Sequence, residues 1–179
     1  MTSTVRDRLF GCLLIAAIMT LFFGGVIVLK GPDRWLTYQE GPEPRISELG
    51  SEPCGAVEHG CDTYRRSWVV TGELTTAFRL DGLFGSWLRW DGELDGLLHV
   101  AFHGTCSGAR VHWGIRADAR TVASGTLSTV PGNRATAHNP TIPGTAGTVT
   151  LTTTWGQKPP GCTSYTLNWD DPEVNTGLF

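Results

Sequence analysis

The chain has 179 residues, a formal net charge of −3 and 17% charged residues. Such a mild charge excludes the strongly basic surface typical of nucleic-acid-binding proteins, so no nucleic-acid partner is expected. Hydrophobic residues make up 40% of the chain, which is enough for one folded domain.

Residues 9–29, LFGCLLIAAIMTLFFGGVIVL, form an uncharged apolar run close to the N-terminus. As an α-helix the run would rise about 31 Å, which matches a hydrocarbon core of about 30 Å. No small-x-small cleavage site follows it, which argues against a cleaved signal peptide. Cys12 stands at the start of the run and not at its end, which argues against a lipoprotein. We predict a transmembrane signal-anchor helix over 9–29.

The charges that flank this run are nearly balanced, so the cysteines decide the predicted orientation. Arg6 and Arg8 precede the run, and Lys30 and Arg34 follow it. An even number of cysteines after the run suits an oxidising compartment, where disulfides persist. We therefore expect a single-pass cell-membrane protein of a bacterial envelope, with residues 1–8 in the cytoplasm and an extracytoplasmic C-terminal domain. The four cysteines of that domain are Cys54, Cys61, Cys106 and Cys162.

One face of the apolar run carries Ala16, Thr20 and Gly24 at four-residue spacing. Rows of small residues let two transmembrane helices approach closely. The row predicts a helix–helix contact, either between two copies of the chain or with another membrane protein.

Two segments flank the predicted domain. Residues 30–53 are rich in proline, glycine and charge and show no periodicity, so they are expected to form an extended stalk. Residues 170–179 are acidic and are expected to form a frayed C-terminal tail.

The interval 54–169 has the pattern of an all-β domain. Thr148 to Trp155 alternate with period two, and Asp-Gly pairs at 81–82, 91–92 and 95–96 are typical of turns. No segment after residue 29 has the pattern of an amphipathic helix. Many short strands separated by turns predict a β-sandwich or a jelly-roll-like domain. The predicted strands are 68–71, 74–80, 97–103, 109–117, 120–127, 147–155 and 163–169.

Two of these strands, 97–103 and 110–116, are expected to form a hairpin with His103 opposite Arg110. In that register the apolar side chains of both strands point to one side. The polar side chains point to the other side and form a predicted interaction face. His99 and His103 would lie about 13 Å apart along one strand, too far to bind one metal ion, so no metal site is expected. The members of this predicted face are His99, His103, Arg110, His112 and Arg116.

Two segments resemble each other, because each has a cysteine followed seven positions later by a tryptophan. They run from Cys106 to Trp113 and from Cys162 to Trp169. Two matching loops at one end of a sandwich would bring their cysteines together. The resemblance favours Cys106–Cys162 and, by elimination, Cys54–Cys61, while two other connectivities stay open.

The segment Asp91-Gly-Glu93-Leu-Asp95-Gly96 resembles the opening of a calcium-binding loop, with oxygen ligands at alternate positions. Position twelve of such a loop is Phe102 and not the bidentate glutamate, and two successive Asp-Gly turns explain the segment equally well. Nearby, Trp87 and Trp90 are candidates for stacking on a sugar ring.

No motif of a hydrolase elbow, a zinc protease, a P-loop or a dinucleotide-binding fold is present. We therefore expect a non-catalytic, membrane-anchored envelope protein without a cofactor, acting as an interaction or accessory subunit of a surface or membrane assembly. The alternative is an extracytoplasmic module that binds glycan or calcium around residues 87–96. A small envelope hydrolase stays open as a third class.

Overall fold

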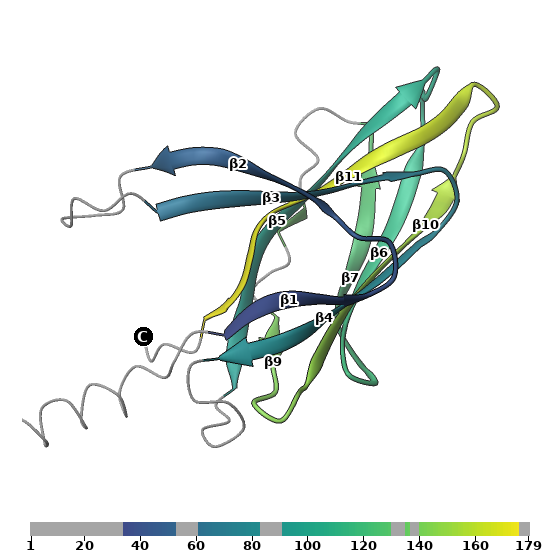
Figure 1. Ribbon diagram of the computed structural model, residues 1–179. Coiled ribbons are helices and arrows are strands. Elements are labelled where there is room, and N and C mark those ends of the chain that lie inside the picture. Colours follow the sequence, from purple (N-terminus) through teal and green to yellow (C-terminus); the bar gives the residue numbers. More distant parts are fainter. Residues whose placement is uncertain (1–33, 53–60, 83–90, 130–134, 137–139, 176–179) are drawn as a thin grey trace, which may run out of the picture.

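The computed structural model describes residues 34–52, 61–82, 91–129, 135–136 and 140–175 (Figure 1). Every regular element in these ranges is a β-strand, which confirms the all-β prediction. They contain no helix that could cross a bilayer, and the predicted span 9–29 lies outside them. The strands are β1 (Arg34–Glu40), β2 (Arg45–Glu52), β3 (Cys61–Val70), β4 (Leu74–Gly82), β5 (Gly92–Gly104), β6 (Arg110–Ala117), β7 (Arg120–Ser128), β8 (Ala135–Thr136), β9 (Thr141–Ile142), β10 (Thr148–Gln157) and β11 (Cys162–Asn175).

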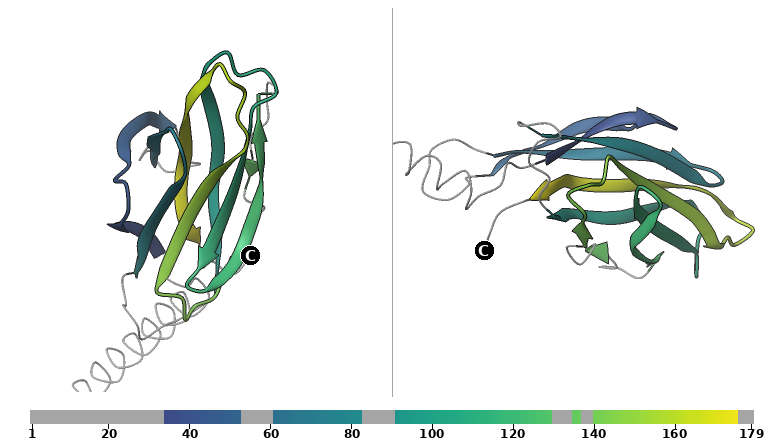
Figure 2. Two further views of the ribbon diagram at one scale, coloured as in Figure 1. Left: turned by 90° about the vertical axis from the view of Figure 1, so that its right-hand side faces the viewer. Right: turned by 90° about the horizontal axis from the view of Figure 1, so that it is seen from below.

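All strand pairs are antiparallel, and the strands form one sheet that curls around its core (Figures 1 and 2). One flank of the sheet has the order β2-β3-β11-β5, with the short strands β8 and β9 on β5. The other flank has the order β1-β4-β10-β6-β7. Pairing of β1 with β11 joins the two flanks into one sheet.

Strand β11 is shared by both flanks because β3 and β1 use the same edge of it in succession. Strand β5 pairs with β11 from Cys162 to Asn175 and occupies the other edge. Strand β3 pairs with β11 as far as Asp170, and β1 pairs with it from Glu173. Between these positions Asp171 has a left-handed backbone with φ of 46°. We call this point, residues 170–173, the fork.

A set of fully buried side chains fills the space inside the curl. Phe78 packs edge-on between Trp68 and Trp169, with ring centroids 6.3 Å and 5.9 Å away. Arg66 points into the same space, where it lies 4.7 Å from the centre of the Phe78 ring. Its guanidinium donates a hydrogen bond of 2.6 Å to the Leu36 carbonyl, and burial lowers its pKa to about 10. Arg66 therefore satisfies the edge of β1 where pairing with β11 has ended.

Four connections cross between the flanks at one end of the domain, which we call the arch end (Figure 1). They are residues 41–44, 71–73, 105–109 and 158–161. The Trp68 indole of β3 donates to the Pro42 carbonyl, and the Trp155 indole of β10 donates to the Thr71 carbonyl, so side chains of two strands hold two of the arches. Arg34 pairs with Val174 at the opposite end.

Strands β1 and β2 correct the predicted stalk, because residues 34–40 and 45–52 belong to the sheet. Only Leu36 of β1 has a buried side chain, and β2 is an edge strand with exposed charges, so no alternation was visible in the sequence. Pro42 and Pro44 lie in the connection between them, where a missing N–H is harmless. The predicted frayed tail is also wrong for residues 170–175, which end β11.

The predicted hairpin of 97–103 with 110–116 is wrong as well. Strand β5 pairs with β11, so that His103 lies opposite Ser164, and β6 pairs with β7 and β10. The inward side chains are nevertheless those that the alternation predicted, and Leu98, Val111 and Ile115 are fully buried. Alternation determines which side of a strand faces the core, but it does not determine which strand lies beside it.

The bridge between Cys106 and Cys162 confirms the preferred disulfide, and it joins the arch 105–109 to the start of β11. Its two cysteines are 56 positions apart.

We expect the double variant Cys106→Ser/Cys162→Ser to lose about 4 kcal/mol of unfolding free energy on the loop-entropy model. Urea unfolding of both proteins measures the loss. A difference below about 1 kcal/mol would contradict this role of the bridge. Cys54 lies outside the described residues, so its predicted pairing with Cys61 stays a prediction.

Gly96 faces the fork and has a φ of 123°. A Cβ atom at this position would lie 2.6 Å from the Trp169 indole nitrogen and 3.1 Å from the Asp170 carbonyl oxygen. We expect Gly96→Ala to reduce the unfolding free energy by about 1–3 kcal/mol, because both the contact and the backbone conformation are strained. Gly72→Ala is the matched control, since nothing lies within 4 Å of its Cβ. Equal melting temperatures for the two variants would refute the expectation.

Candidate interaction face on strands β3, β11 and β5

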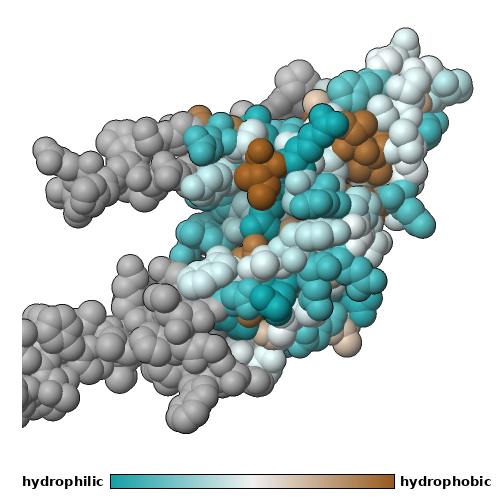
Figure 3. Space-filling model, in the orientation of Figure 1, coloured by the Kyte–Doolittle hydropathy of each residue, from teal (hydrophilic) through white to brown (hydrophobic). Residues whose placement is uncertain are grey.

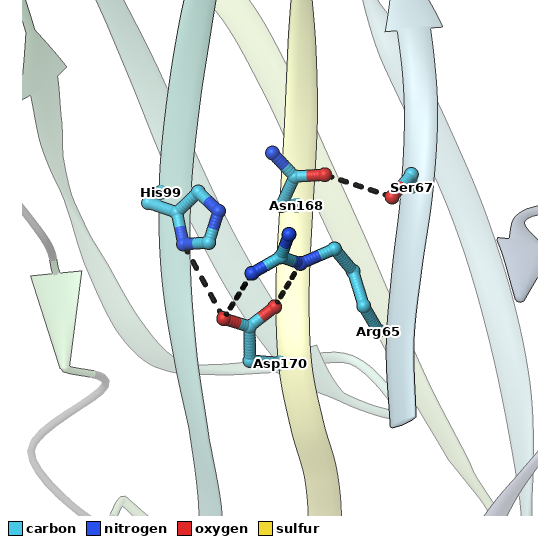
Figure 4. Close-up of polar contacts among 5 residues, drawn as sticks. All are labelled: Arg65, Ser67, His99, Asn168 and Asp170. Carbon is cyan, nitrogen blue, oxygen red and sulfur yellow. Dashed lines mark hydrogen bonds and ion pairs between the residues drawn. The ribbon is translucent and has the colours of Figure 1, made fainter. Parts of the chain in front are cut away.

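The outer face of β3, β11 and β5 carries a set of polar side chains that we call the polar row (Figure 4). The register places Arg65 opposite Asp170, and it places Asn168 between Ser67 on one side and His99 on the other. Neighbours on these strands at alternate positions, such as Trp68, Leu167 and Trp169, point inward and are buried. The polar row consists of Arg65, Ser67, His99, His103, Thr166, Asn168 and Asp170.

Asp170 is the centre of this row. The Arg65 guanidinium donates two hydrogen bonds to its carboxylate, at 2.7 Å and 3.1 Å. Nδ1 of His99 lies 3.5 Å from the same carboxylate. The Asp170 side chain keeps only 17% of its exposure and that of His99 only 20%, so water screens the contact incompletely. The hydrogen bond from Arg65 to Asp170 raises the pKa of that guanidinium.

The remaining members of the row are held in pairs across neighbouring strands. The Ser67 hydroxyl donates to the amide oxygen of Asn168 at 2.8 Å. Nε2 of His103 lies 2.7 Å from the Thr166 hydroxyl oxygen. Cross-strand pairs of this kind fix side-chain orientation and stabilise the sheet by about 0.2–1 kcal/mol each. The row is therefore a preorganised polar surface.

The row holds a serine, a histidine and an aspartate, but their geometry does not form a nucleophile and its base. Ser67 and His99 lie on β3 and β5, with β11 between them. Two strand spacings separate such side chains by about 9.6 Å, well beyond hydrogen-bond distance. The Ser67 hydroxyl is engaged by Asn168 instead. Within the described ranges, no three His, Cys, Asp or Glu side chains lie close enough together to hold a metal ion.

The structure divides the predicted interaction face between the two flanks. His99 and His103 belong to the polar row, whereas Arg110, His112 and Arg116 project from β6 on the other flank. Nδ1 of His112 lies 2.9 Å from the Thr126 hydroxyl of β7, and Arg116 donates to the Ala119 carbonyl. The prediction of one continuous face is wrong, because the connection 105–109 is an arch between flanks and not a hairpin turn.

The calcium-loop prediction is wrong in its geometry. Glu93 and Asp95 lie in the extended strand β5, and Gly96 faces the fork instead of making a turn. The Asp91 carboxylate accepts a hydrogen bond of 2.7 Å from the Gly144 amide. A calcium loop wraps its ligands around the ion, whereas alternate residues of a strand stand about 6.6 Å apart. Several other predicted positions lie outside the described residues, namely Trp87, Trp90, Ala16, Thr20 and Gly24.

Sequence reasoning missed Arg65, Ser67, Asn168 and Asp170. Asp170 was assigned to a frayed tail, and Arg65 lies 105 positions before it. Their opposite charges are a weak signal until the pairing of β3 with β11 is known. The prediction of a strand over 163–169 did identify the central part of β11.

No protein-family model matches this chain, and no curated protein was found to be similar to it in sequence. The function is therefore inferred from the geometry of the polar row and of the arch end.

Asp171 provides a pH test of the fork next to the polar row. Burial raises the pKa of its carboxyl above the usual 3.8, and the nearby Asp95 and Asp170 carboxylates raise it further. Because the pKa of Asp171 is raised in the folded state, the Asp171 carboxyl contributes most to stability below pH 3.8. This contribution falls as the pH rises through the folded-state pKa.

We therefore expect Asp171→Asn to stabilise the protein at pH 7 by less than about 1 kcal/mol, with the gain disappearing at pH 3. Asparagine also tolerates the left-handed backbone of this position. Chemical unfolding at both pH values measures the effect. A variant less stable than the wild type at pH 7 would show that the carboxylate is favourable at the fork.

Proposed function

We propose that the protein is a non-catalytic, single-pass membrane protein of the cell envelope, and that its extracytoplasmic β-domain serves as an interaction or accessory subunit of a surface or membrane assembly. The observation that carries the proposal is the polar row, in which seven side chains on three strands are fixed by mutual contacts and present no nucleophile–base pair.

The chemistry of the row suits protein recognition. Charged and polar groups held in place before binding lose little conformational freedom on association, and they select partners by complementary charge. The face shown in Figure 3 supports the same role, because its apolar patches are small and separated by hydrophilic side chains. The most exposed large apolar residues of the described ranges are Ile46 at 66% and Val69 at 65%. Recognition by polar contacts therefore suits this domain better than a broad apolar interface.

The chain length between the predicted span and the domain supports a position close to the membrane. Four residues separate the end of the apolar run at Leu29 from the start of β1 at Arg34, and four residues reach at most about 14 Å. In this arrangement the end of the domain with Arg34 and Val174 is the membrane-proximal end. The arch end points away from the membrane.

A β-sandwich architecture is part of the same proposal. The two flanks bury a single core between them, and they are joined through β11. Two antiparallel layers around one core are the arrangement that defines sandwich domains.

Co-purification of the full-length protein from its native membranes in mild detergent tests the proposal. We expect a stoichiometric protein partner or a homo-oligomer, and we expect the double variant His99→Ala/Asp170→Ala to lose it. Arg116→Ala, on the opposite flank, is the control and should retain the complex. Thermal unfolding of each variant separates loss of binding from loss of folding. A monomer in every sample would refute the proposal.

A further inference from the structure

A half-open pocket of about 320 Å³ lies at the arch end, between the connection 41–44 and the end of β3. Its size is at the lower limit of pockets that bind small ligands, and it would hold one side chain of a peptide with its neighbouring backbone. The pocket is lined by Pro42, Glu43, Arg45 and residues 67–74.

One wall of the pocket is an unpaired strand edge. Pairing of β2 with β3 begins at Arg45 opposite Ser67, so no strand of the described ranges pairs with this edge of β3 from Trp68 to Val70. The chain before Arg45 turns away to the other flank, where the Pro42 carbonyl accepts hydrogen bonds from Trp68 and Thr76. A free strand edge presents backbone N–H and C=O groups that can pair with an added extended segment.

The charged side chains of the pocket favour a cation. The acidic residues Glu43 and Glu73 line it together with the basic residue Arg45, and all three residues are exposed. The exposed Val69 side chain, at 65%, adds an apolar contact beside them. Two negative groups against one positive group leave a net negative site next to a strand edge.

We propose that this pocket binds an extended segment of a partner protein, which adds to the free edge of β3 and places a lysine or arginine side chain between Glu43 and Glu73. The inference rests on the proposed function in that both require a protein partner, and it names the chemistry of that partner. The pocket lies at the arch end, and the proposed membrane-proximal end is the opposite one, where β1 begins and β11 ends, so a partner in the envelope could reach the pocket.

The test measures binding of three labelled peptides to the full-length protein in detergent by fluorescence anisotropy. The peptides are acetylated and amidated Thr-Val-Lys-Val-Thr and its versions with glutamine or glutamate in place of lysine. We expect the lysine peptide to bind at least about fivefold more tightly than the glutamate peptide, with the glutamine peptide between them. Equal affinities, or no binding of any peptide, would overturn the proposal.

Two variants test the site itself. Glu43→Gln/Glu73→Gln should remove the preference for lysine, whereas the control Glu48→Gln/Glu93→Gln, with the same change of charge outside the pocket, should keep it. Gly72→Leu should weaken all three peptides, because Gly72 lines the pocket and its Cβ would enter open space without strain. Unchanged binding by both pocket variants would overturn the proposal.

The same peptides also separate this proposal from the proposed function. His99→Ala/Asp170→Ala should bind them like the wild type while losing the co-purified partner. If that variant keeps the partner but the pocket variants lose peptide binding, the pocket stands and the polar row does not.

Discussion

The sharing of one edge of β11 by two strands is the constraint on which the rest of the structure depends. Strand β3 leaves this edge at Asp170 and β1 takes it over at Glu173, so the sheet divides into two flanks that must close over one core. Asp171 has a left-handed backbone at the division, and the absence of a side chain at Gly96 lets β5 approach β11 at the same point. Arg66 supplies a hydrogen bond to Leu36, where pairing of β1 with β11 has ended.

The position of the polar row depends on the same strand. Residues near 66, near 100 and near 168 meet because β11 lies between β3 and β5. Asp170 is both the last residue paired with β3 and the acceptor for Arg65, with His99 3.5 Å away, so the ion pair and the fork stabilise one point of the sheet. Contacts of this kind hold the side chains of the polar row in fixed orientations.

The two ends of the domain differ for a physical reason. At one end, the start of β1 lies beside the end of β11. The start of β1 is also close in sequence to the apolar run that we interpret as the membrane anchor. At the other end, indole hydrogen bonds from β3 and β10 hold two of the four arches, and the Cys106–Cys162 bridge joins a third to the start of β11. Because the connection 41–44 crosses to the other flank, no strand of the described ranges pairs with the edge of β3 beside Val69, where the pocket lies.

The sequence by itself determined the all-β class and the inward side chains of β5 and β6, because period-two alternation is a local signal. It favoured the Cys106–Cys162 bridge over two other connectivities. It did not determine which strands pair, since a strand with one apolar side can lie beside any partner of the same pattern. The predicted hairpin failed for that reason, whereas the predicted stalk failed because β1 and β2 show no alternation of buried and exposed side chains. Only the tertiary structure decided that β5 joins β11, that Arg65 meets Asp170, and that the segment after residue 33 completes the sheet.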